Sequence, residues 1–234
     1  TADRAYLVNR VAAEKYPDAK FTAFGGLCLN RPVGGLNPDA VETSLKLGAK
    51  VIWLPTNTAE NHYRKNGKDP SKGVVVTRDG KAVDELQDIF ALVKQYNAVL
   101  ATGHIGAEEC FPVVEAARAA GVKKIVITHP EFWVVGMTPE QQADIVRKYD
   151  VLLESVYAQP VNGNYKINIP DNIAAMKAIG PEHFVLSTDS GQTVNPYWYE
   201  SYTTYFKAVS EAFTPEQVRK MTHDNPAWLL DIDQ

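Results

Sequence analysis

The sequence is poor in several features that mark common protein classes. It has only two cysteines, Cys28 and Cys110, in 234 residues, which argues against a disulfide framework. Lysine and arginine total 24 against 28 aspartates and glutamates, a net charge of -4, whereas a nucleic-acid surface needs clustered positive charge. No apolar run is long enough to cross a membrane. We therefore expect no nucleic-acid or membrane partner, and two buried, reduced cysteines, as is typical of a cytoplasmic protein.

Several catalytic and nucleotide-binding motifs are also missing. The sequence has no Gly-x-Ser-x-Gly elbow, and neither cysteine stands beside a histidine, so serine or thiol nucleophile chemistry is poorly supported. It has no Walker loop, and no glycine-rich fingerprint follows the first strand-like run, which disfavours nucleotide binding. The chain begins at Thr1 without methionine or a signal sequence, directly in a helical pattern. We expect that its natural beginning is missing.

Six apolar runs of strand length follow one another, and each precedes an amphipathic helical stretch. A further helix is expected at the front, over residues 2–16. Asn37 and Thr138 each stand before a proline, a pattern typical of a helix N-cap followed by the first helical residue. Asp79-Gly80 between short apolar runs predicts a small hairpin near residues 73–83. The six runs end at Asn30, Pro55, His104, His129, Val156 and Asp189.

The strand-like runs are mostly continuous rather than alternating, which indicates parallel strands covered on both sides. The fold class is therefore α/β. An open doubly wound sheet and a (β/α)8 TIM barrel remain as alternatives, and polar residues at the carboxyl ends of several strands favour the barrel. We predict a single barrel domain over residues 1–234. Since only six strand–helix units are present, a complete barrel requires two more strands before Thr1.

Three polar side chains end otherwise apolar strands. His104 ends AVLATGH, His129 lies near the end of KIVITHP and Asp189 ends HFVLSTD. The carboxyl ends of barrel strands meet at one rim, and two imidazoles with a carboxylate suit zinc or a similar divalent ion. Taken singly, each histidine has a simpler interpretation as a hydrogen-bonding loop residue, and the aspartate as a helix N-cap.

Other residues have two open interpretations each. Glu154, near the end of VLLESV, is a further ligand, a hydrogen-bond acceptor for a ligand imidazole, or one half of a structural ion pair. His62, in the polar loop after the second strand-like run, either holds substrate or lies in solvent. His183 precedes its strand and should point to the opposite rim. His223 is expected on a helix surface or in packing.

The segment STDSGQTVNPYWYE follows the last strand-like run. Gln192 and its neighbours either present polar groups to a substrate or form a structural turn. Trp133, in EFWVVGM, is either an apolar wall of the substrate site or part of a packing patch. The aromatic residues from Tyr197 to Phe206 are either an interface of a homo-oligomer or, more simply, buried against the barrel.

These residues resemble the amidohydrolase superfamily of metal-dependent barrel hydrolases. The matching pieces are ATGH, ITHP, STDSGQ and the terminal DNPAWLL, and they resemble more narrowly an uncharacterised branch, a domain of unknown function. The resemblance implies that His104 and His129 are the fifth- and sixth-strand ligands. It implies that Asp189 is the eighth-strand aspartate, which binds metal and accepts a proton from the nucleophilic water.

The sequence departs from the superfamily pattern at two points. It has no His-x-His pair, which the superfamily carries at the end of its first strand, and this agrees with two missing strands. Leu54-Pro55-Thr56 stands where many relatives have a bridging lysine or glutamate. One metal is therefore favoured over two, with zinc first and manganese or iron as alternatives.

We predict hydrolysis of an ester, lactone or amide bond of a small molecule by metal-activated water. A metal-dependent decarboxylase or lyase of the same barrel type is the alternative enzyme, since Arg31 or Arg64 could bind a carboxylate. A non-catalytic barrel that binds a small ligand is the alternative from another class.

Overall fold

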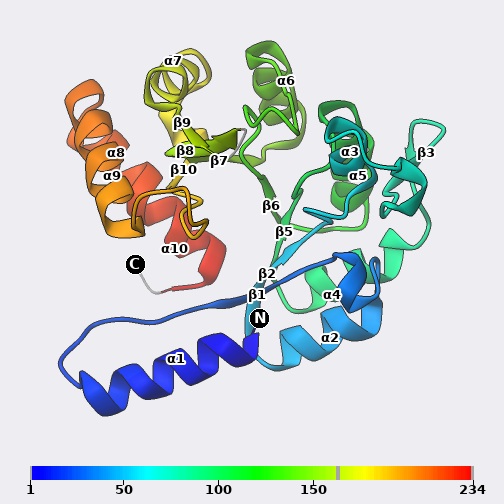
Figure 1. Cartoon of the computed structure of the whole chain (residues 1–234), viewed down its shortest axis with the longest axis horizontal. Coiled ribbons are helices and arrows are strands. Elements are labelled where there is room, and N and C mark those ends of the chain that lie inside the picture. Colours follow the sequence, from blue (N-terminus) through cyan, green and yellow to red (C-terminus); the bar gives the residue numbers. More distant parts are fainter. Residues whose placement is uncertain (1, 162–163, 233–234) are drawn as a thin grey trace. The chain divides into compact units, whose positions relative to one another are not determined.

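The computed structural model describes residues 2–161 and 164–232. Its main sheet has six strands, in the order β1-β2-β5-β6-β7-β10 (Figure 1). The strands are β1 (Gly25–Cys28), β2 (Ala49–Trp53), β5 (Val99–Ala101), β6 (Lys124–Ile127), β7 (Leu152–Val156) and β10 (Phe184–Ser187). The pairs β1–β2, β2–β5, β6–β7 and β7–β10 are parallel. The prediction of parallel strands alternating with helices is confirmed.

Helices follow the strands, as predicted, except that residues 60–65 form a helix where the sequence analysis expected a polar loop. They are α1 (Ala2–Lys15), α2 (Pro38–Lys46), α3 (Glu60–Lys65), α4 (Leu86–Gln95), α5 (Ala107–Ala119), α6 (Pro139–Tyr149), α7 (Ile169–Ile179), α8 (Trp198–Ala212), α9 (Pro215–Arg219) and α10 (Asn225–Leu230). Both predicted caps form. The Asn37 side chain accepts from the amides of Asp39 and Ala40, and Thr138 accepts from the amide of Gln141. None of the helices in the described part of the chain has the length and apolar character that a membrane crossing requires.

The chain divides into two compact units, Thr1–Ile125 and Val126–Gln234, and each is described by itself. The prediction of one barrel domain, and of strands before Thr1, stays a prediction. In the first unit, α2 and α4 pack together (Figure 1) over a core of fully buried side chains such as Ile52, Phe90 and Leu100.

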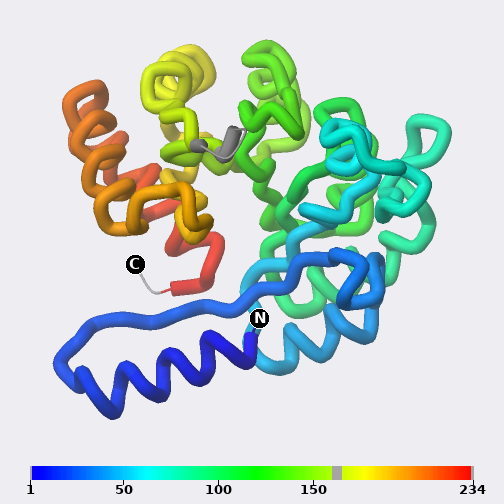
Figure 2. Tube along the Cα trace, in the orientation of Figure 1, coloured from blue at the N-terminus to red at the C-terminus, as the bar shows by residue number. Residues whose placement is uncertain are grey.

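An extended segment turns back after α1 and runs beside it towards β1 (Figure 2). The Asn9 side chain holds the two together through both backbone groups of Ala23, at 2.7 and 2.9 Å. A Cβ on Gly25 would lie 2.4 Å from the Cα of Ala2. The start of α1 therefore contacts β1 closely.

Two small hairpins stand beside the main sheet. β3 (Thr77–Arg78) and β4 (Lys81–Ala82) pair in antiparallel fashion around Asp79-Gly80, within the segment where the sequence predicts a hairpin. β8 (Ala158–Val161) and β9 (Asn164–Ile167) form a second antiparallel pair, which the sequence analysis did not predict. Its sequence signal is Asn162-Gly163, a dipeptide typical of hairpin turns, which lies outside the described residues.

The core of the second unit lies between β6, β7, β10 and the helices after them. Leu153, Phe184 and Val209 are buried there. It also contains the buried polar side chains of Ser155, Asn172 and Tyr205. The Tyr205 hydroxyl forms hydrogen bonds with Ser155 and with Asn172. A packed core in which these three polar side chains are hydrogen-bonded therefore supports the carboxyl ends of these strands.

Candidate metal centre

The three predicted ligands all follow carboxyl ends of strands in the main sheet. His104 comes three residues after β5, and His129 and Asp189 come two residues after β6 and β10. His104 belongs to the first unit, whereas His129 and Asp189 belong to the second. The geometry of each part is given separately below.

In the first unit, His104 lies against His62 of α3. Their Nδ1 atoms are 2.8 Å apart, and the rings stack with centroids 4.9 Å apart and planes at 16°. A neutral imidazole carries one N–H, so one ring donates to the other. Burial, followed by the charge of Lys68, lowers the pKa of His62. The structure therefore brings together a predicted metal ligand and a predicted substrate residue as a pair of imidazoles.

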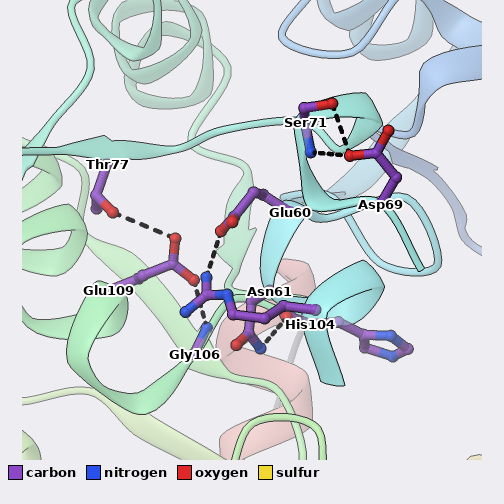
Figure 3. A network of polar contacts seen from close by, with 9 residues as sticks. Glu60, Asn61, Asp69, Ser71, Thr77, His104, Gly106 and Glu109 are labelled. Atoms are coloured by element: carbon purple, nitrogen blue, oxygen red, sulfur yellow. Dashed lines mark hydrogen bonds and ion pairs between the residues drawn. The ribbon is translucent and has the colours of Figure 1, made fainter. Parts of the chain in front are cut away.

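The backbone of His104 is held from two sides. Its amide donates to the carbonyl of Pro55 at 3.0 Å, and its carbonyl accepts from Nδ2 of Asn61 at 3.0 Å (Figure 3). Asn61 is buried and immediately precedes His62. The sequence analysis did not single out Asn61, because a lone asparagine in a polar loop has no distinguishing pattern.

Gly103 permits the close turn before His104. Its φ is +63°, a left-handed conformation that side chains disfavour. A Cβ there would lie 2.5 Å from the carbonyl oxygen of Leu54 and 2.7 Å from that of Pro55. Only glycine lets the backbone pass the end of β2 at this distance.

A second polar contact fixes the helix after His104. Glu109 accepts from the amide of Gly106 at 2.7 Å and from the hydroxyl of Thr77 at 3.2 Å (Figure 3). Burial raises the pKa of Glu109, and these two hydrogen bonds oppose the shift. The carboxyl therefore joins the β3–β4 hairpin to the start of α5. Nearby on α3, Arg64 forms an ion pair with Glu60 (Figure 3).

In the second unit, His129 is almost fully buried, with 3% of its surface exposed. Burial lowers its pKa to about 4, so the ring is neutral at neutral pH, the form in which histidine binds metal. The ring of Phe132 packs edge-on at 4.7 Å. The φ of His129 is +26° and that of Asp189 is +50°. Such conformations are uncommon outside glycine, and they concentrate at functional sites.

Asp189 and Glu154 form a pair of crowded carboxyl groups. Burial raises the pKa of Asp189 to about 6, and a hydrogen bond from Gln192 opposes this. Burial and then the charge of Asp189 raise the pKa of Glu154 to about 7, against a hydrogen bond with Ser187. An adjacent cation would lower both pKa values, because opposite charge stabilises the ionised form. The chemistry of this pair therefore suits a bound cation.

A pocket of about 620 Å³ follows Asp189, and Gln192, Asn195 and Trp198 are among its lining residues. Asn195 donates to the carbonyl of Asp189 at 3.2 Å, so the loop is tied to the predicted ligand. Volumes of this size are typical of small-molecule sites. Trp133 is 40% exposed and packs against Phe132.

The structure also shows a buried carboxyl that the sequence analysis missed. Oε1 of Glu131 is buried without a hydrogen-bond partner, and burial raises the pKa of Glu131 to about 8. Glu131 follows His129 by two residues, inside the apolar segment EFWVVGM. That single acidic residue in an apolar context was the available signal.

The two remaining histidines lie apart from these groups in sequence. His183 ends a short helical turn before β10, as expected for the opposite end of that strand. His223 is exposed, and its Nδ1 lies 2.9 Å from Asp224. Neither is a candidate ligand.

The types of donor atom in the predicted ligands, and their geometry, decide whether they can bind a metal ion. Imidazole nitrogens and carboxylate oxygens are suitable zinc ligands, and His104, His129 and Asp189 supply both kinds. Within the described ranges, no group of three or more histidine, cysteine, aspartate or glutamate side chains is already close enough to hold an ion. The donor types therefore fit a divalent metal by their chemistry.

Comparisons with known proteins identify the family and the fold. The model of a protein family described as "Family of unknown function (DUF6282)" matches residues 1–154. No curated protein matches the chain in sequence.

Three solved structures illustrate the likeness in fold. An amidohydrolase from Pseudomonas aeruginosa is 13% identical, with a TM-score of 0.56 over 83% of this chain and 67% of that one. A putative 2-pyrone-4,6-dicarboxylic acid hydrolase from Pseudomonas putida is 13% identical, with a TM-score of 0.60 over 100% and 79%. A 2,6-dihydroxybenzoate decarboxylase from Rhizobium is 16% identical, with a TM-score of 0.55 over 100% and 78%.

These neighbours are enzymes of the amidohydrolase superfamily. The fold of this chain is therefore of the amidohydrolase-like TIM-barrel type, and its six parallel strands are part of that pattern. The predicted resemblance to amidohydrolases in fold is confirmed, and the matching family model is one of unknown function, as predicted. At these identities the likeness concerns the fold alone.

Proposed function

The chain belongs to a family of unknown function (DUF6282), and on that premise we propose that it is a metal-dependent hydrolase acting on an ester, lactone or amide bond of a small molecule. The observation that carries the proposal is the position and the backbone conformation of His129 and Asp189. Each follows a parallel strand of the same unit, and each has a left-handed backbone. His129 is buried as a neutral imidazole.

The proposed ligands are His104, His129 and Asp189, with one zinc ion as the first candidate and manganese or iron as alternatives. A divalent cation supplies Lewis acidity, which makes water nucleophilic at neutral pH and polarises the bond to be cleaved. The assignment of His104, which belongs to the first unit, rests on the sequence pattern. The experiment below tests it separately from Asp189.

Asp189 has the second role of accepting a proton at its carboxylate. Burial raises the pKa of Asp189 to about 6 without a cation, and a bound cation would lower it, so that the carboxylate is ionised and able to accept a proton at neutral pH. Gln192 hydrogen-bonds this carboxyl, which holds its orientation. The charge of Asp189 raises the pKa of Glu154, so Glu154 holds its own proton more tightly while Asp189 is ionised.

We assign substrate binding to the pocket after β10, with Gln192 and Trp198 in its wall, and Trp133 keeps its predicted role as an apolar substrate contact. His62, in the first unit, keeps its predicted role as a substrate contact. Both amide and aromatic groups are present, which suits a substrate with a polar carbonyl and an apolar body.

A decarboxylase is the second candidate, because one neighbour in fold is a 2,6-dihydroxybenzoate decarboxylase. That reaction requires a group that binds the substrate carboxylate. Arg64 is already paired with Glu60, and Arg31 donates to the carbonyl of Lys72 at 3.2 Å. These existing contacts favour the hydrolase.

The test is elemental analysis of the purified protein and of His104→Ala and Asp189→Ala, with His223→Ala as a matched control outside the site. We expect about one equivalent of zinc, manganese or iron per chain, retained in His223→Ala and lost in both other variants. Esters, lactones and amides are then screened at neutral pH, and carbon dioxide release is followed in parallel with aromatic acids. A folded protein that holds no metal would contradict the proposal, and carbon dioxide release without hydrolysis would favour the decarboxylase.

A further inference from the structure

His62 and His104 form a contact that the proposed function does not require. They come from different elements, α3 and the turn after β5, and they are 42 residues apart in sequence. Nevertheless, their Nδ1 atoms lie 2.8 Å from each other. Two nitrogens of the same kind thus point at one small region of space.

Both backbones are fixed, so the pair is preorganised. His104 is held by Pro55 and Asn61. The carbonyl of His62 accepts from Nδ2 of Asn66 at 2.8 Å, and the Asn61 that holds His104 is the residue next to His62. A movement of α3 therefore moves both histidines together, which preserves their separation.

We propose that His62 is a metal ligand together with His104, so that these two Nδ1 atoms hold the same divalent cation. The inference rests on the proposed function, which names His104 as a ligand, and it changes the role of His62 from substrate contact to ligand.

The distances allow this with a small side-chain movement. Two nitrogens that share a tetrahedral zinc ion at about 2.0–2.1 Å lie about 3.3 Å apart. The Nδ1 atoms are 2.8 Å apart, so they must separate by about 0.5 Å. The ring that donates the hydrogen bond must also carry its proton on Nε2 instead of Nδ1, and both rings must turn so that their lone pairs meet at the ion. Both rings are half-buried, and partial burial limits competition from water.

The alternative is that His62 only positions His104 by stacking or by a hydrogen bond. The stacked geometry, with ring centroids 4.9 Å apart, makes this a real competitor. Substitutions of His62 separate the two roles, because phenylalanine keeps an aromatic ring but has no nitrogen that binds metal. Cysteine, in contrast, lacks the ring but offers a thiolate that binds zinc or cobalt.

The experiment measures Zn²⁺ and Co²⁺ affinity by competition with a chromophoric chelator. It compares the intact chain with His62→Ala, His62→Phe and His62→Cys, and with His223→Ala as control. Circular dichroism confirms folding of each variant. We expect at least about a 100-fold loss of affinity in the alanine and phenylalanine variants, and no change in His223→Ala. We also expect a thiolate–cobalt charge-transfer band in His62→Cys.

The measured affinities distinguish the ligand role of His62 from ring stacking and from failure of the proposed function. Wild-type affinity in both His62→Ala and His62→Phe would overturn the ligand role and leave the metal-dependent hydrolase intact. Wild-type affinity in His62→Phe alone would overturn it in favour of ring stacking. A folded wild-type chain that binds neither ion would overturn the proposed function, and this inference with it.

Discussion

The hydroxyl of Tyr205 on α8 lies 2.7 Å from the hydroxyl of Ser155 on β7. The same phenol oxygen accepts from Nδ2 of Asn172 on α7, also at 2.7 Å, and Asn172 donates to the carbonyl of Val156. All three side chains are buried. The Tyr205 hydroxyl thus connects α7 and α8 to β7, in which Glu154 directly precedes Ser155.

Removal of that hydroxyl is expected to destabilise the protein. Tyr205→Phe keeps the ring but leaves buried partners of the phenol unsatisfied, which costs ~1–3 kcal/mol. Urea unfolding measures the change. Tyr199→Phe is the matched control on the same helix, because Tyr199 is 51% exposed, and its effect should stay within ~0.5 kcal/mol. Equal effects of the two variants would show that the buried contacts contribute little.

The turn at Gly103 provides a second prediction with an internal control. Gly103 and Gly67 have nearly the same φ, +63° and +65°. A Cβ at Gly67 meets nothing within 4 Å, whereas at Gly103 it meets the Leu54 carbonyl oxygen at 2.5 Å. Gly67→Ala should therefore cost ~1–2 kcal/mol for its backbone alone, and Gly103→Ala a further ~1–3 kcal/mol for the clash.

Thermal or urea unfolding of these two alanine variants gives the difference. Because Gly103 directly precedes His104, we also expect Gly103→Ala to weaken metal binding, and Gly67→Ala to leave it unchanged. Similar stability of the two variants would mean that the end of β2 can yield to a methyl group.

Glu109 predicts a pH dependence of stability. Its folded-state pKa is raised above the ordinary value of 4.5 by burial, so the folded chain holds the proton more tightly than the unfolded chain does. This contribution to stability is complete below pH 4.5 and is lost as pH rises through the folded-state pKa. Glu109→Gln does not titrate, and its amide can still accept from Gly106 and donate to Thr77.

We therefore expect Glu109→Gln to gain stability relative to the wild type as pH rises from 4.5 to neutral. The measurement is the free energy of unfolding at several pH values. Glu115→Gln, at an exposed position of the same helix, should follow the wild-type curve. A Glu109→Gln curve parallel to that of the wild type would show that the carboxyl is not effectively buried in solution.

Asp189→Asn tests the proposed proton acceptor. The amide keeps the size of the side chain but cannot accept the proton, and loss of a general base lowers rates by about 10²–10⁴-fold. We expect a decrease of that order in kcat/KM for whichever ester, lactone or amide the screen identifies. Asp171→Asn is the control in the same unit, since Asp171 lies 3.8 Å from Lys166 in an exposed pair. A fall of less than tenfold in Asp189→Asn would remove Asp189 from this role.

The sequence alone was sufficient for the order of the six main strands and for the positions of the candidate ligands after them, whereas α3 lies in a segment that was expected to be a loop. Apolar runs, prolines and capping residues act over a few neighbours, so the six strands, the caps at Asn37 and Thr138, and the hairpin at Asp79-Gly80 could be predicted. The same local signals placed His104, His129 and Asp189 after the carboxyl ends of strands. The β8–β9 hairpin was missed although its turn dipeptide is present in the sequence.

Only the tertiary structure showed which side chains meet and how far they are from water. His62 and His104 are 42 residues apart, and their contact depends on the path of the whole first unit rather than on any local pattern. The burial that raises the pKa values of Glu131 and Glu154 comes from surrounding elements in the same way. Sequence periodicity encodes which face of an element is apolar, but distance and desolvation arise only when the elements pack.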